Sequence, residues 1–401
     1  MLNPSILSKT VQAFIDQHLH DNPAQIILKG SSFEHVSGKE LAQQIEGKKR
    51  IQKKLPTWFK TRGIYYPPTL NLSQSSSEIT ANYKAGLLEG HSLIDITGGF
   101  GVDDYFFLQK FNRVIYCEQD PDLAEIVRHN LSLLNPLKTP TYIVGNSLDY
   151  VKKQTQKIDW IYADPGRRSQ ADQKIFKLEE SEPNILKHLN LLLSKSKKIL
   201  LKTSPLLDLQ MGLEQIQTVQ EIHIVAVKND VKELLWIIGE QSRQKIRIKT
   251  VNFGTHRLQT FLSFWGEEKP IQNTYNYPQT YLYEPNSAIL KAGLFKKVAK
   301  DYNLDKLAVH THLYTSTQLV DFPGRRFRII KCLPYNKKNL KSLHLKNAHI
   351  TTRNFPLSVK QIRRIHRIAE GGEDYLFCTQ SFDKNKIIIW CEKIKFNAST
   401  A

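Results

Sequence analysis

Cysteine is scarce in this 401-residue sequence, and the few cysteines are widely spaced. They stand at positions Cys117, Cys332, Cys378 and Cys391, and no two of them form a C-x-x-C pair. This spacing argues against a disulfide framework and against a cysteine-ligated zinc site. We therefore expect reduced, mostly buried thiols, a cytoplasmic location and no bound metal.

Long apolar runs are also missing. No apolar stretch reaches the roughly 18 residues that a membrane-spanning helix needs. Residues 1–22 contain no apolar segment and include Asp16 and Asp21, so they do not have the pattern of a signal peptide. We expect no membrane partner.

Acidic residues are absent from two long segments, 47–77 and 322–369, although the whole chain contains 38 of them. The first segment has these basic residues: Lys48, Lys49, Arg50, Lys53, Lys54, Lys60 and Arg62. The second has these: Arg325, Arg326, Arg328, Lys331, Lys337, Lys338, Lys341, Lys346, Arg353, Lys360, Arg363, Arg364 and Arg367. Together they exceed the formal net charge of +19, so the rest of the chain is near neutral. Such blocks predict a polyanionic partner, which we take to be nucleic acid; a basic surface tuned for solubility is the alternative.

From residue 93 to residue 239, short apolar segments alternate with amphipathic ones, which is the pattern of a parallel sheet with crossover helices. Strands are expected at 93–97, 113–117, 141–145, 158–163 and 198–203. Helices are expected at 123–134 and 179–193. Two further strands, 221–227 and 232–239, meet at Asn229-Asp230 without a helix between them, which indicates a hairpin.

The N-terminal region has the pattern of a helical segment. Ser37 with Glu40, and Ser75 with Glu78, have the spacing of capping boxes that would begin two helices. Gly90 would end the second helix just before the first strand.

The C-terminal region has a mixed pattern. Two strands are expected within 244–265, and a segment rich in Pro, Asn and Tyr at 270–280 predicts a linker. Apolar residues at helical spacing predict one helix over 286–302, another helix is expected at 358–368, and a hairpin is expected to end in Ile387–Trp390.

The stretch Leu93-Ile-Asp-Ile-Thr-Gly-Gly-Phe-Gly-Val-Asp103 combines a predicted strand, an acid and a glycine cluster. Glycines at a strand-to-helix turn let backbone N–H groups come close to a ligand. The spacing differs from the dinucleotide fingerprint, because reading G-x-G-x-x-G from Gly99 puts Asp104 at the last glycine position. Many ordinary loops also contain three glycines.

An acid on the strand before the glycines resembles motif I of the class I S-adenosylmethionine-dependent methyltransferases. The resemblance implies that Asp95 lies near the methionine end of the cofactor, S-adenosyl-L-methionine. It also implies that the turn formed by Thr97, Gly98, Gly99 and Gly101 packs against that cofactor. The preceding segment, 72–84, resembles the helix that covers the methionine moiety in this class, although it could equally be a packing helix.

Polar residues follow the next two predicted strands. Glu118 lies 23 residues after Asp95, and an acid at about this distance from the glycine turn accepts hydrogen bonds from ribose hydroxyls. The adjacent Gln119 could line the adenosine pocket. In the resemblance, Asn146 meets the adenine after the third strand; the alternative is that Asn146 or Ser147 caps a helix.

The sharpest local motif is Asp164-Pro165-Gly166-Arg167-Arg168, at the end of the strand expected at 158–163. Asp-Pro at this place resembles motif IV of the nucleic-acid and amino-group methyltransferases. The resemblance implies that Asp164 borders the cofactor and accepts a hydrogen bond from the nitrogen to be methylated, with Pro165 beside the substrate. Positioning supplies much of the rate of an in-line displacement, and Asp164 could also take up the proton.

This motif departs from the family's Asp/Asn-Pro-Pro-Tyr/Phe form, because Gly166 and Arg167 replace the second proline and the aromatic residue. No aromatic side chain is then available here to stack on a flipped base, which argues against exocyclic-amine chemistry. Arg167 and Arg168 could instead hold a phosphate; the alternative is a pair of surface salt bridges.

Methylation of a pyrimidine carbon needs a cysteine nucleophile, and no cysteine lies between Cys117 and Cys332. We therefore expect direct attack by a nitrogen or an oxygen. His310 and His312 would share one face of a strand, as metal ligands can. Because no cysteine or acid cluster lies near them in sequence, we interpret them as a structural pair and predict no metal.

Five segments are similar to a family of bacterial methyltransferase-like proteins that have a small ferredoxin-like module and a THUMP-like C-terminal domain: Asp164–Arg168, Lys202–Asp208, Tyr281–Lys291, Asp321–Arg325 and Asn347–Pro356. The similarity extends over nearly the whole chain. It implies an α/β protein with a Rossmann-like, seven-stranded class I methyltransferase sheet. The parts would be a helical region 1–90, a methyltransferase domain 91–270, a ferredoxin-like module 278–324 and a THUMP-like domain 325–396.

THUMP domains are RNA-binding modules of RNA-modifying enzymes. The resemblance therefore implies that Arg325, Arg326, Arg363 and Arg364 contact RNA, which we expect to be tRNA or rRNA. The sequence predicts a cytoplasmic S-adenosylmethionine-dependent methyltransferase that modifies a nitrogen or oxygen of structured RNA. The alternatives are a methyltransferase for a protein or small molecule, and a non-catalytic RNA-binding protein on the same fold.

Overall fold

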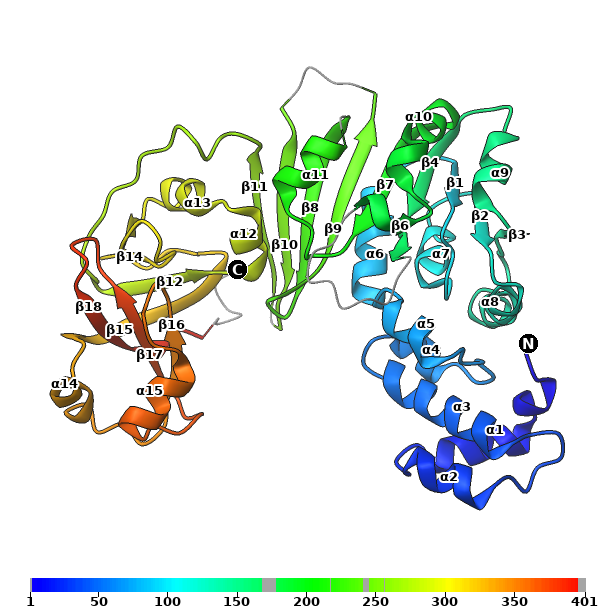
Figure 1. Ribbon diagram of the computed structural model, residues 1–401, viewed down its shortest axis with the longest axis horizontal. Coiled ribbons are helices and arrows are strands. Elements are labelled where there is room, and N and C mark those ends of the chain that lie inside the picture. Colours follow the sequence, from blue (N-terminus) through cyan, green and yellow to red (C-terminus); the bar gives the residue numbers. More distant parts are fainter. Residues whose placement is uncertain (1, 168–177, 217, 241–244, 256, 396–401) are drawn as a thin grey trace. The chain divides into compact units, whose positions relative to one another are not determined.

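The computed structural model describes residues 2–167, 178–216, 218–240, 245–255 and 257–395 (Figure 1). The chain divides into two compact units. Residues 1–219 and 236–242 form the first, and residues 220–235 and 243–401 form the second. No helix among the described residues is both long and apolar enough to cross a lipid bilayer.

Short helices make up the N-terminal part of the first unit (blue in Figure 1): η1 Pro4–Leu7, α1 Lys9–Gln17, α2 Pro23–Lys29, α3 Gly38–Ile51, α4 Pro56–Lys60, α5 Thr69–Gln74 and α6 Glu78–Leu87. Helix α3 begins with the predicted capping box. Ser37 Oγ accepts a hydrogen bond from Glu40 N at 3.2 Å, and Glu40 Oε2 accepts one from Ser37 N at 2.8 Å. These bonds satisfy backbone donors that a helix start leaves unpaired. Leu41 and Ile45 then bury the inner face of the helix.

The second predicted capping box is wrong. Ser77 caps α6 by accepting a hydrogen bond from Thr80 N at 3.3 Å, whereas Ser75 follows the end of α5. Glu78 instead binds the start of α4, where its carboxylate accepts hydrogen bonds from N and Oγ1 of Thr57 at 2.6 and 2.9 Å. A carboxylate is favoured there because the first turn of a helix has unpaired N–H groups.

Strands and helices alternate through the rest of the first unit: β1 Ser92–Asp95, α7 Val102–Phe107, β2 Arg113–Glu118, α8 Pro121–Leu134, β3 Thr141–Val144, α9 Ser147–Lys152, β4 Ile158–Ala163, α10 Ile185–Lys195, β7 Ser196–Thr203 and α11 Leu209–Gln215. The pairings among these five strands are all parallel. In the register, Ile94 of β1 lies between Ile115 of β2 and Ile161 of β4, and all three are fully buried. The apolar strands therefore form the core of an α/β sheet, as predicted.

A small two-stranded sheet accompanies this one. Strand β5 Gly166–Arg167 pairs antiparallel with β6 Ser181–Glu182, which follows the short helix η2 Leu178–Glu180.

Four more strands complete the large sheet: β8 Val219–Val227, β9 Asp230–Gly239, β10 Arg247–Phe253 and β11 Leu258–Phe264. The strand order is β11-β10-β8-β9-β7-β4-β1-β2-β3. The seven strands from β8 to β3 in this order form the predicted methyltransferase sheet, which ends in the predicted hairpin of β8 and β9. Strands β10 and β11 extend it, with β10 parallel to β8 and antiparallel to β11.

The rest of the second unit is an α+β fold: β12 Tyr281–Pro285, α12 Ser287–Ala292, α13 Phe295–Asp301, β13 Asp305–Lys306, β14 Tyr314–Ser316, β15 Gly324–Pro334, α14 Lys337–Lys341, β16 His349–Thr352, α15 Val359–His366, β17 Asp374–Gln380 and β18 Lys386–Lys393. Its seven strands have the order β13-β14-β12-β15-β18-β17-β16. Phe327 of β15 and Phe377 of β17 are fully buried and pack edge to face, with ring centroids 4.9 Å apart. Aromatic pairs of this geometry stabilise a core beyond their buried area.

Two details of the second unit differ from the prediction. The single helix expected over 286–302 is broken into α12 and α13 at Gly293, whose φ of 70° lies in the left-handed region. His310 and His312 lie in the segment between β13 and β14 instead of on a strand. His312 stacks on Phe295 with ring centroids 3.6 Å apart, and burial lowers its pKa to about 4. Within the described ranges, no three His, Cys, Asp or Glu residues are grouped as metal ligands would be.

Candidate active site

A cavity of about 270 Å³ lies at the carboxyl ends of strands β1, β2 and β4 in the first unit. Ligands of open α/β sheets bind at this edge. Many of the predicted site residues line it, namely Asp95, Thr97, Gly98, Gly99, Gly101, Glu118, Gln119 and Asp164. Four residues that precede α6 also line it, namely Asn71, Gln74, Ser75 and Ser76. The structure thus brings the glycine turn, the acid after β2 and the Asp-Pro motif together around one cavity.

Thr97 connects Asp95 at the end of β1 with Asp164 after the end of β4. Asp95 Oδ1 accepts hydrogen bonds from Thr97 N at 2.7 Å and from Thr97 Oγ1 at 3.1 Å. Thr97 Oγ1 in turn accepts a hydrogen bond from Asp164 N at 2.7 Å. The ends of β1 and β4 are therefore held together by a short chain of hydrogen bonds.

Two positions of the glycine turn have no room for a side chain. A Cβ on Gly98 would lie 2.2 Å from the ring of Tyr116, and a Cβ on Gly101 would lie 2.6 Å from a methyl group of Val127. Gly99 and Gly101 also have φ values of 53° and 70°, in the left-handed region that favours glycine. The turn can therefore approach both the sheet and a ligand closely.

Glu118 supports the same turn. Its Oε2 accepts a hydrogen bond from Gly99 N at 2.9 Å, and its Oε1 accepts hydrogen bonds from Gln119 N at 2.8 Å and Asp120 N at 3.0 Å. A carboxylate can accept about four hydrogen bonds, so Glu118 retains capacity for a ligand hydroxyl. Gln119 is exposed at the edge of the cavity.

Asp164 forms an ion pair with Lys202, at the end of the neighbouring strand β7. Pro165 is buried next to Asp164, and the backbone of Arg167 belongs to β5. The side chain of Arg167 and the whole of Arg168 lie outside the described residues.

Asn146 is not among the residues that line the cavity. Its Oδ1 accepts a hydrogen bond from Leu148 N at 2.9 Å and caps helix α9. The structure therefore shows that Asn146 caps a helix, and its contact with the adenine stays a prediction.

A buried polar network behind the cavity was missed by the sequence analysis. Lys84 Nζ of α6 lies 3.1 Å from Asp103 Oδ1, and its side chain is 0% exposed. Asp103 Oδ2 accepts hydrogen bonds from Ser76 Oγ and Tyr162 Oη, both at 2.8 Å. The only sequence signal was Asp103 as the last residue of the glycine stretch; nothing paired it with a lysine 19 positions earlier.

Burial and charge determine the ionisation of these acids. Burial by itself would raise the pKa of Asp103, but Lys84 and Lys202 lower it below the ordinary value. Asp104 is fully buried, and burial with the nearby charges of Asp95 and Asp103 raises its pKa well above the ordinary range. Burial also raises the pKa of Asp95 to about 8, so the protonated form is favoured in the pair of Asp95 and Asp104, beside Asp103 and its partner Lys84.

Cys117 also lines the cavity, but it is a buried thiol whose pKa is raised by burial and by the nearby acids. A raised pKa disfavours the thiolate form that a nucleophile requires.

The four arginines predicted to contact RNA lie in the second unit and differ in their surroundings. Arg325 Nε donates to Glu284 Oε2 at 2.5 Å, and Arg326 Nη1 donates to Asp321 Oδ1 at 3.2 Å. Arg363 donates to the carbonyl oxygens of Ala348 and Ile368, at 2.9 and 3.2 Å, and also to Glu370. These bonds show that Arg363 joins the end of α15 to the loops around it. Arg364, in contrast, is exposed.

Two family models match the C-terminal part of the chain. A ferredoxin-like domain model matches residues 281–323, and a model described as THUMP domain-like matches residues 324–393. No curated protein matches this sequence.

Solved structures resemble the chain to different extents. A protein from Porphyromonas gingivalis W83, assigned as a methyltransferase, matches with 32% sequence identity and a TM-score of 0.87, over 98% of this chain and 100% of that chain. An O-methyltransferase from Bacillus cereus, solved with SAH, is 13% identical with a TM-score of 0.33, over 43% of this chain and 87% of that chain. An rRNA methylase from Streptococcus thermophilus is 14% identical with a TM-score of 0.29, over 41% of this chain and 95% of that chain.

The fold and the cavity agree with the first of these similarities. The class I methyltransferase resemblance implied three features that the structure contains: the order of the strands, the glycine turn after β1 and the acid at the end of β2. With 32% identity over the full length of the P. gingivalis protein, this chain belongs to its family, the class I methyltransferases that also contain a ferredoxin-like and a THUMP-like domain.

Proposed function

We propose that this protein transfers a methyl group from S-adenosyl-L-methionine to a nitrogen or oxygen atom of a structured RNA. The observation that supports the proposal best is the charge of the cavity. Its described lining contains the acidic residues Asp95, Asp103, Glu118, Asp164 and Glu182 and no lysine or arginine. Two of these acids are paired with lysines behind the lining, Asp103 with Lys84 and Asp164 with Lys202, and burial raises the pKa of Asp95 to about 8. Acidic groups still outnumber basic ones at this place, in a chain whose net charge is +19. An acidic cavity favours a cationic ligand, and S-adenosylmethionine has a sulfonium and an ammonium group, whereas a dinucleotide has an anionic pyrophosphate.

The residues of the cavity suit each part of this cofactor. Asp95 and the glycine turn would border the methionine part, with the acidic side chains facing its positive charges. Glu118 would accept hydrogen bonds from the ribose hydroxyls, and Gln119 would border the adenosine. Bound here, S-adenosylmethionine supplies a methyl group on a positively charged sulfur.

Asp164 is the residue that we propose for the chemical step. Its backbone N donates to Thr97, and its carboxylate is held by Lys202, so its position is fixed from two sides. A fixed carboxylate can accept a hydrogen bond from the N–H or O–H group that is methylated and can take up its proton. Because the thiol of Cys117 is buried with a raised pKa, we propose direct attack without a cysteine nucleophile.

RNA is the substrate class that we propose, expected to be tRNA or rRNA. The THUMP-like match over residues 324–393 includes most of the acid-free basic segment 322–369. We accordingly propose four functional parts: 1–90, the methyltransferase domain 91–270, the ferredoxin-like module 278–324 and the THUMP-like domain 325–396.

A labelled-methyl transfer assay tests this function. RNA from cells that lack this gene is incubated with the protein and labelled S-adenosylmethionine, with a protein extract in parallel. The Asp164→Ala variant should lose transfer and keep cofactor binding in calorimetry. Asp149→Ala, which removes an exposed acid of the same unit, is the matched control and should remain active.

The outcomes separate the alternatives. Label that enters RNA and is lost only with Asp164→Ala supports the proposal. Label that enters protein alone rejects RNA as the substrate. If neither pool is labelled and the native protein does not bind S-adenosylmethionine, the proposed activity itself is rejected.

A further inference from the structure

Asp104 lies in the first turn of α7, directly after Asp103, which lines the cavity beside Asp164. Asp104 itself is not among the described residues that line this cavity, and its side chain is 0% exposed. A buried carboxyl group costs free energy unless it is hydrogen-bonded, paired or protonated. The methyl transfer proposed above gives Asp104 no role.

The carboxyl groups of Asp104 and Asp95 interact with each other as hydrogen-bond partners. Neither carboxyl oxygen of Asp104 accepts a hydrogen bond of ordinary geometry from another residue in the described part of the chain. Ionised carboxylates have only acceptor atoms, so a hydrogen bond between two of them requires a proton on one. The contact therefore places a shared hydrogen between Asp95 and Asp104.

The charges around this pair also favour its protonated form. Asp103 adds a negative charge beside both groups. The two lysines of the region are paired with other acids, Lys84 with Asp103 and Lys202 with Asp164. Burial has the largest effect, and it raises the pKa of Asp95 to about 8. The pair as a whole therefore holds its protons at neutral pH.

Other titratable and charged groups surround the pair and Asp103 on the elements packed against α7 and β1. They are Lys84 of α6, Tyr116, Cys117 and Glu118 of β2, Tyr142 of β3, Tyr162 of β4, Asp164 after β4 and Lys202 of β7.

Four of these groups keep one charge state near neutral pH. Burial raises the pKa values of Tyr116, Cys117 and Tyr142, so these three stay neutral. Burial would raise the pKa of Asp103 as well, but the lysines Lys84 and Lys202 lower it below the ordinary value, so Asp103 stays ionised. A change of protonation near neutral pH therefore belongs to the pair and not to these four groups.

We propose that Asp104 is a positioning residue for the cofactor: it shares a hydrogen with Asp95, and the pair releases one proton to solvent when the ammonium group of S-adenosylmethionine binds beside Asp95. Asp104 keeps its hydrogen in the bound state and donates it to Asp95, whose carboxylate then faces the ammonium group. At Asp95 one positive charge takes the place of another, so the buried cluster keeps its net charge. The inference rests on the proposed binding of this cofactor beside Asp95 and adds the proton that is exchanged for it.

The exchange predicts how the affinity depends on pH. A proton and the ammonium group compete for the same carboxylate, so the affinity rises with pH until the pair has lost its proton. Native affinity, measured by calorimetry, should fall at least ~10-fold between pH 7.5 and pH 5.5. The α-amino group of the cofactor loses its own proton at about pH 8, so each variant is compared with the native protein at the same pH, where the ionisation of the ligand is identical.

Calorimetry in two buffers of different ionisation enthalpy counts the released protons. At pH 7 the native protein should release between about 0.5 and 1 proton for each S-adenosylmethionine bound. Asp95→Asn should release almost none, because its amide does not titrate. Asp149→Asn changes an exposed acid of the same unit and is the matched control, which should release as many protons as the native protein.

Two variants of Asp104 separate positioning from packing. Asp104→Asn keeps a donor for Asp95 and should bind S-adenosylmethionine within about 3-fold of the native affinity. Asp104→Leu has a similar size and no donor, so Asp95 holds its proton more tightly and the affinity at pH 7 should fall at least ~10-fold. This deficit should become smaller at pH 8.5, where the proton leaves more easily, whereas a displaced α7 would give the same deficit at both pH values. Urea unfolding checks that both variants are folded.

The outcomes distinguish this inference from the proposed function. Native binding without proton release would overturn the inference and leave the methyltransferase activity intact. An Asp104→Leu deficit that is equal at pH 7 and pH 8.5, or an equal deficit in Asp104→Asn, would also overturn it. A native protein that does not bind S-adenosylmethionine would reject the proposed activity itself.

Discussion

Lys202 at the end of β7 forms an ion pair with Asp164 Oδ2 at the end of β4, and the two side chains are 13% and 31% exposed. A carboxylate that must accept a hydrogen bond from a substrate is thereby held in one position. Lys202 is therefore a positioning residue for the proposed methyl transfer.

Lys202→Met should lower kcat on the order of 10- to 100-fold, since the carboxylate loses the cation that orients it. The affinity for S-adenosylmethionine, measured by calorimetry, should change much less. Lys202→Arg preserves the charge and should recover part of kcat, which separates positioning from a general loss of stability. A Lys202→Met variant with native kcat and weaker cofactor binding would contradict this role.

Lys84 and Asp103 form the buried ion pair behind the cavity. Lys84→Met should destabilise the protein by about 3 to 5 kcal/mol, because it leaves a buried carboxylate without its cation. The double variant Lys84→Met with Asp103→Asn should recover a large part of this loss, as the buried charge is then absent. Urea unfolding of the two single variants and the double variant measures the coupling.

An exposed pair provides the control for this cycle. Lys152 lies 3.2 Å from Asp149, and both side chains are more than half exposed. Lys152→Met should change the free energy of unfolding by less than about 1 kcal/mol. A similar small effect for Lys84→Met would show that the buried pair does not stabilise the first unit.

The sequence was sufficient to predict the cavity because the relevant residues follow strands. Asp95, Glu118 and Asp164 each stand at or just after the carboxyl end of a parallel strand, and parallel strands bring these ends to one edge. The seven predicted strands all belong to the nine-stranded sheet. Each of them could be predicted because it has its own apolar pattern. Local sequence patterns were enough to predict the site because the fold brings the ends of these strands to one edge of the sheet.

Contacts between distant segments could not be predicted in this way. Lys84 on α6 and Lys202 on β7 pair with acids on other elements, and no spacing pattern in the sequence links either lysine to its acid. Gly293 interrupts an apolar pattern that continues on both sides of it, so periodicity alone predicted one helix. Asn146 satisfied both a helix-cap pattern and a base-contact pattern, and the structure shows the cap through the hydrogen bond from Leu148 N.

Gly98 tests the glycine turn most directly. Gly98→Ala should reduce S-adenosylmethionine affinity by at least ~10-fold, because its Cβ would collide with the ring of Tyr116 at 2.2 Å and displace the turn. Gly99→Ala is the matched control: its Cβ would have no atom closer than 3.7 Å, and its φ of 53° adds strain of only about 1 to 2 kcal/mol. Equal losses of affinity in both variants would indicate backbone strain instead of the collision with Tyr116.

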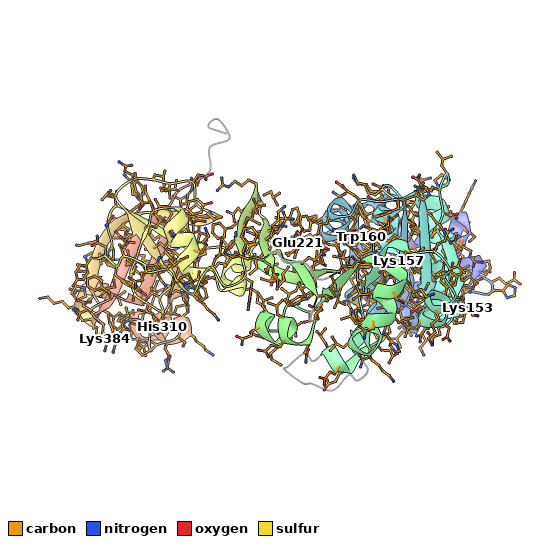
Figure 2. The ribbon with its side chains drawn as sticks, turned by 90° about the horizontal axis from the view of Figure 1, so that it is seen from above. Lys153, Lys157, Trp160, Glu221, His310 and Lys384 are labelled. Carbon is orange, nitrogen blue, oxygen red and sulfur yellow. The ribbon has the colours of Figure 1, made fainter. Side chains whose placement is uncertain are left out.

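Glu221 on β8, labelled in Figure 2, should make the stability of the second unit depend on pH. A hydrogen bond from His223, together with the Arg247 guanidinium, lowers the pKa of Glu221 from 4.5 to about 2, against the effect of burial. Because the folded-state pKa is the lower one, the unfolded chain binds more protons between these values, and stability rises with pH across them. The stabilisation that ionised Glu221 provides is therefore complete above about pH 5 and is lost as the pH falls towards 2.

Glu221→Gln should remove this dependence. Denaturation from pH 7 to pH 3 should show the variant about 2 kcal/mol less stable than the native protein at pH 7, after allowance for the partial exposure of the pair, and closer to it at pH 3. Glu240→Gln removes a carboxylate that is 90% exposed and should give a curve parallel to that of the native protein. If Glu221→Gln also gave a parallel curve, the hydrogen bond from His223 and the ion pair with Arg247 would not hold Glu221 ionised in the folded protein.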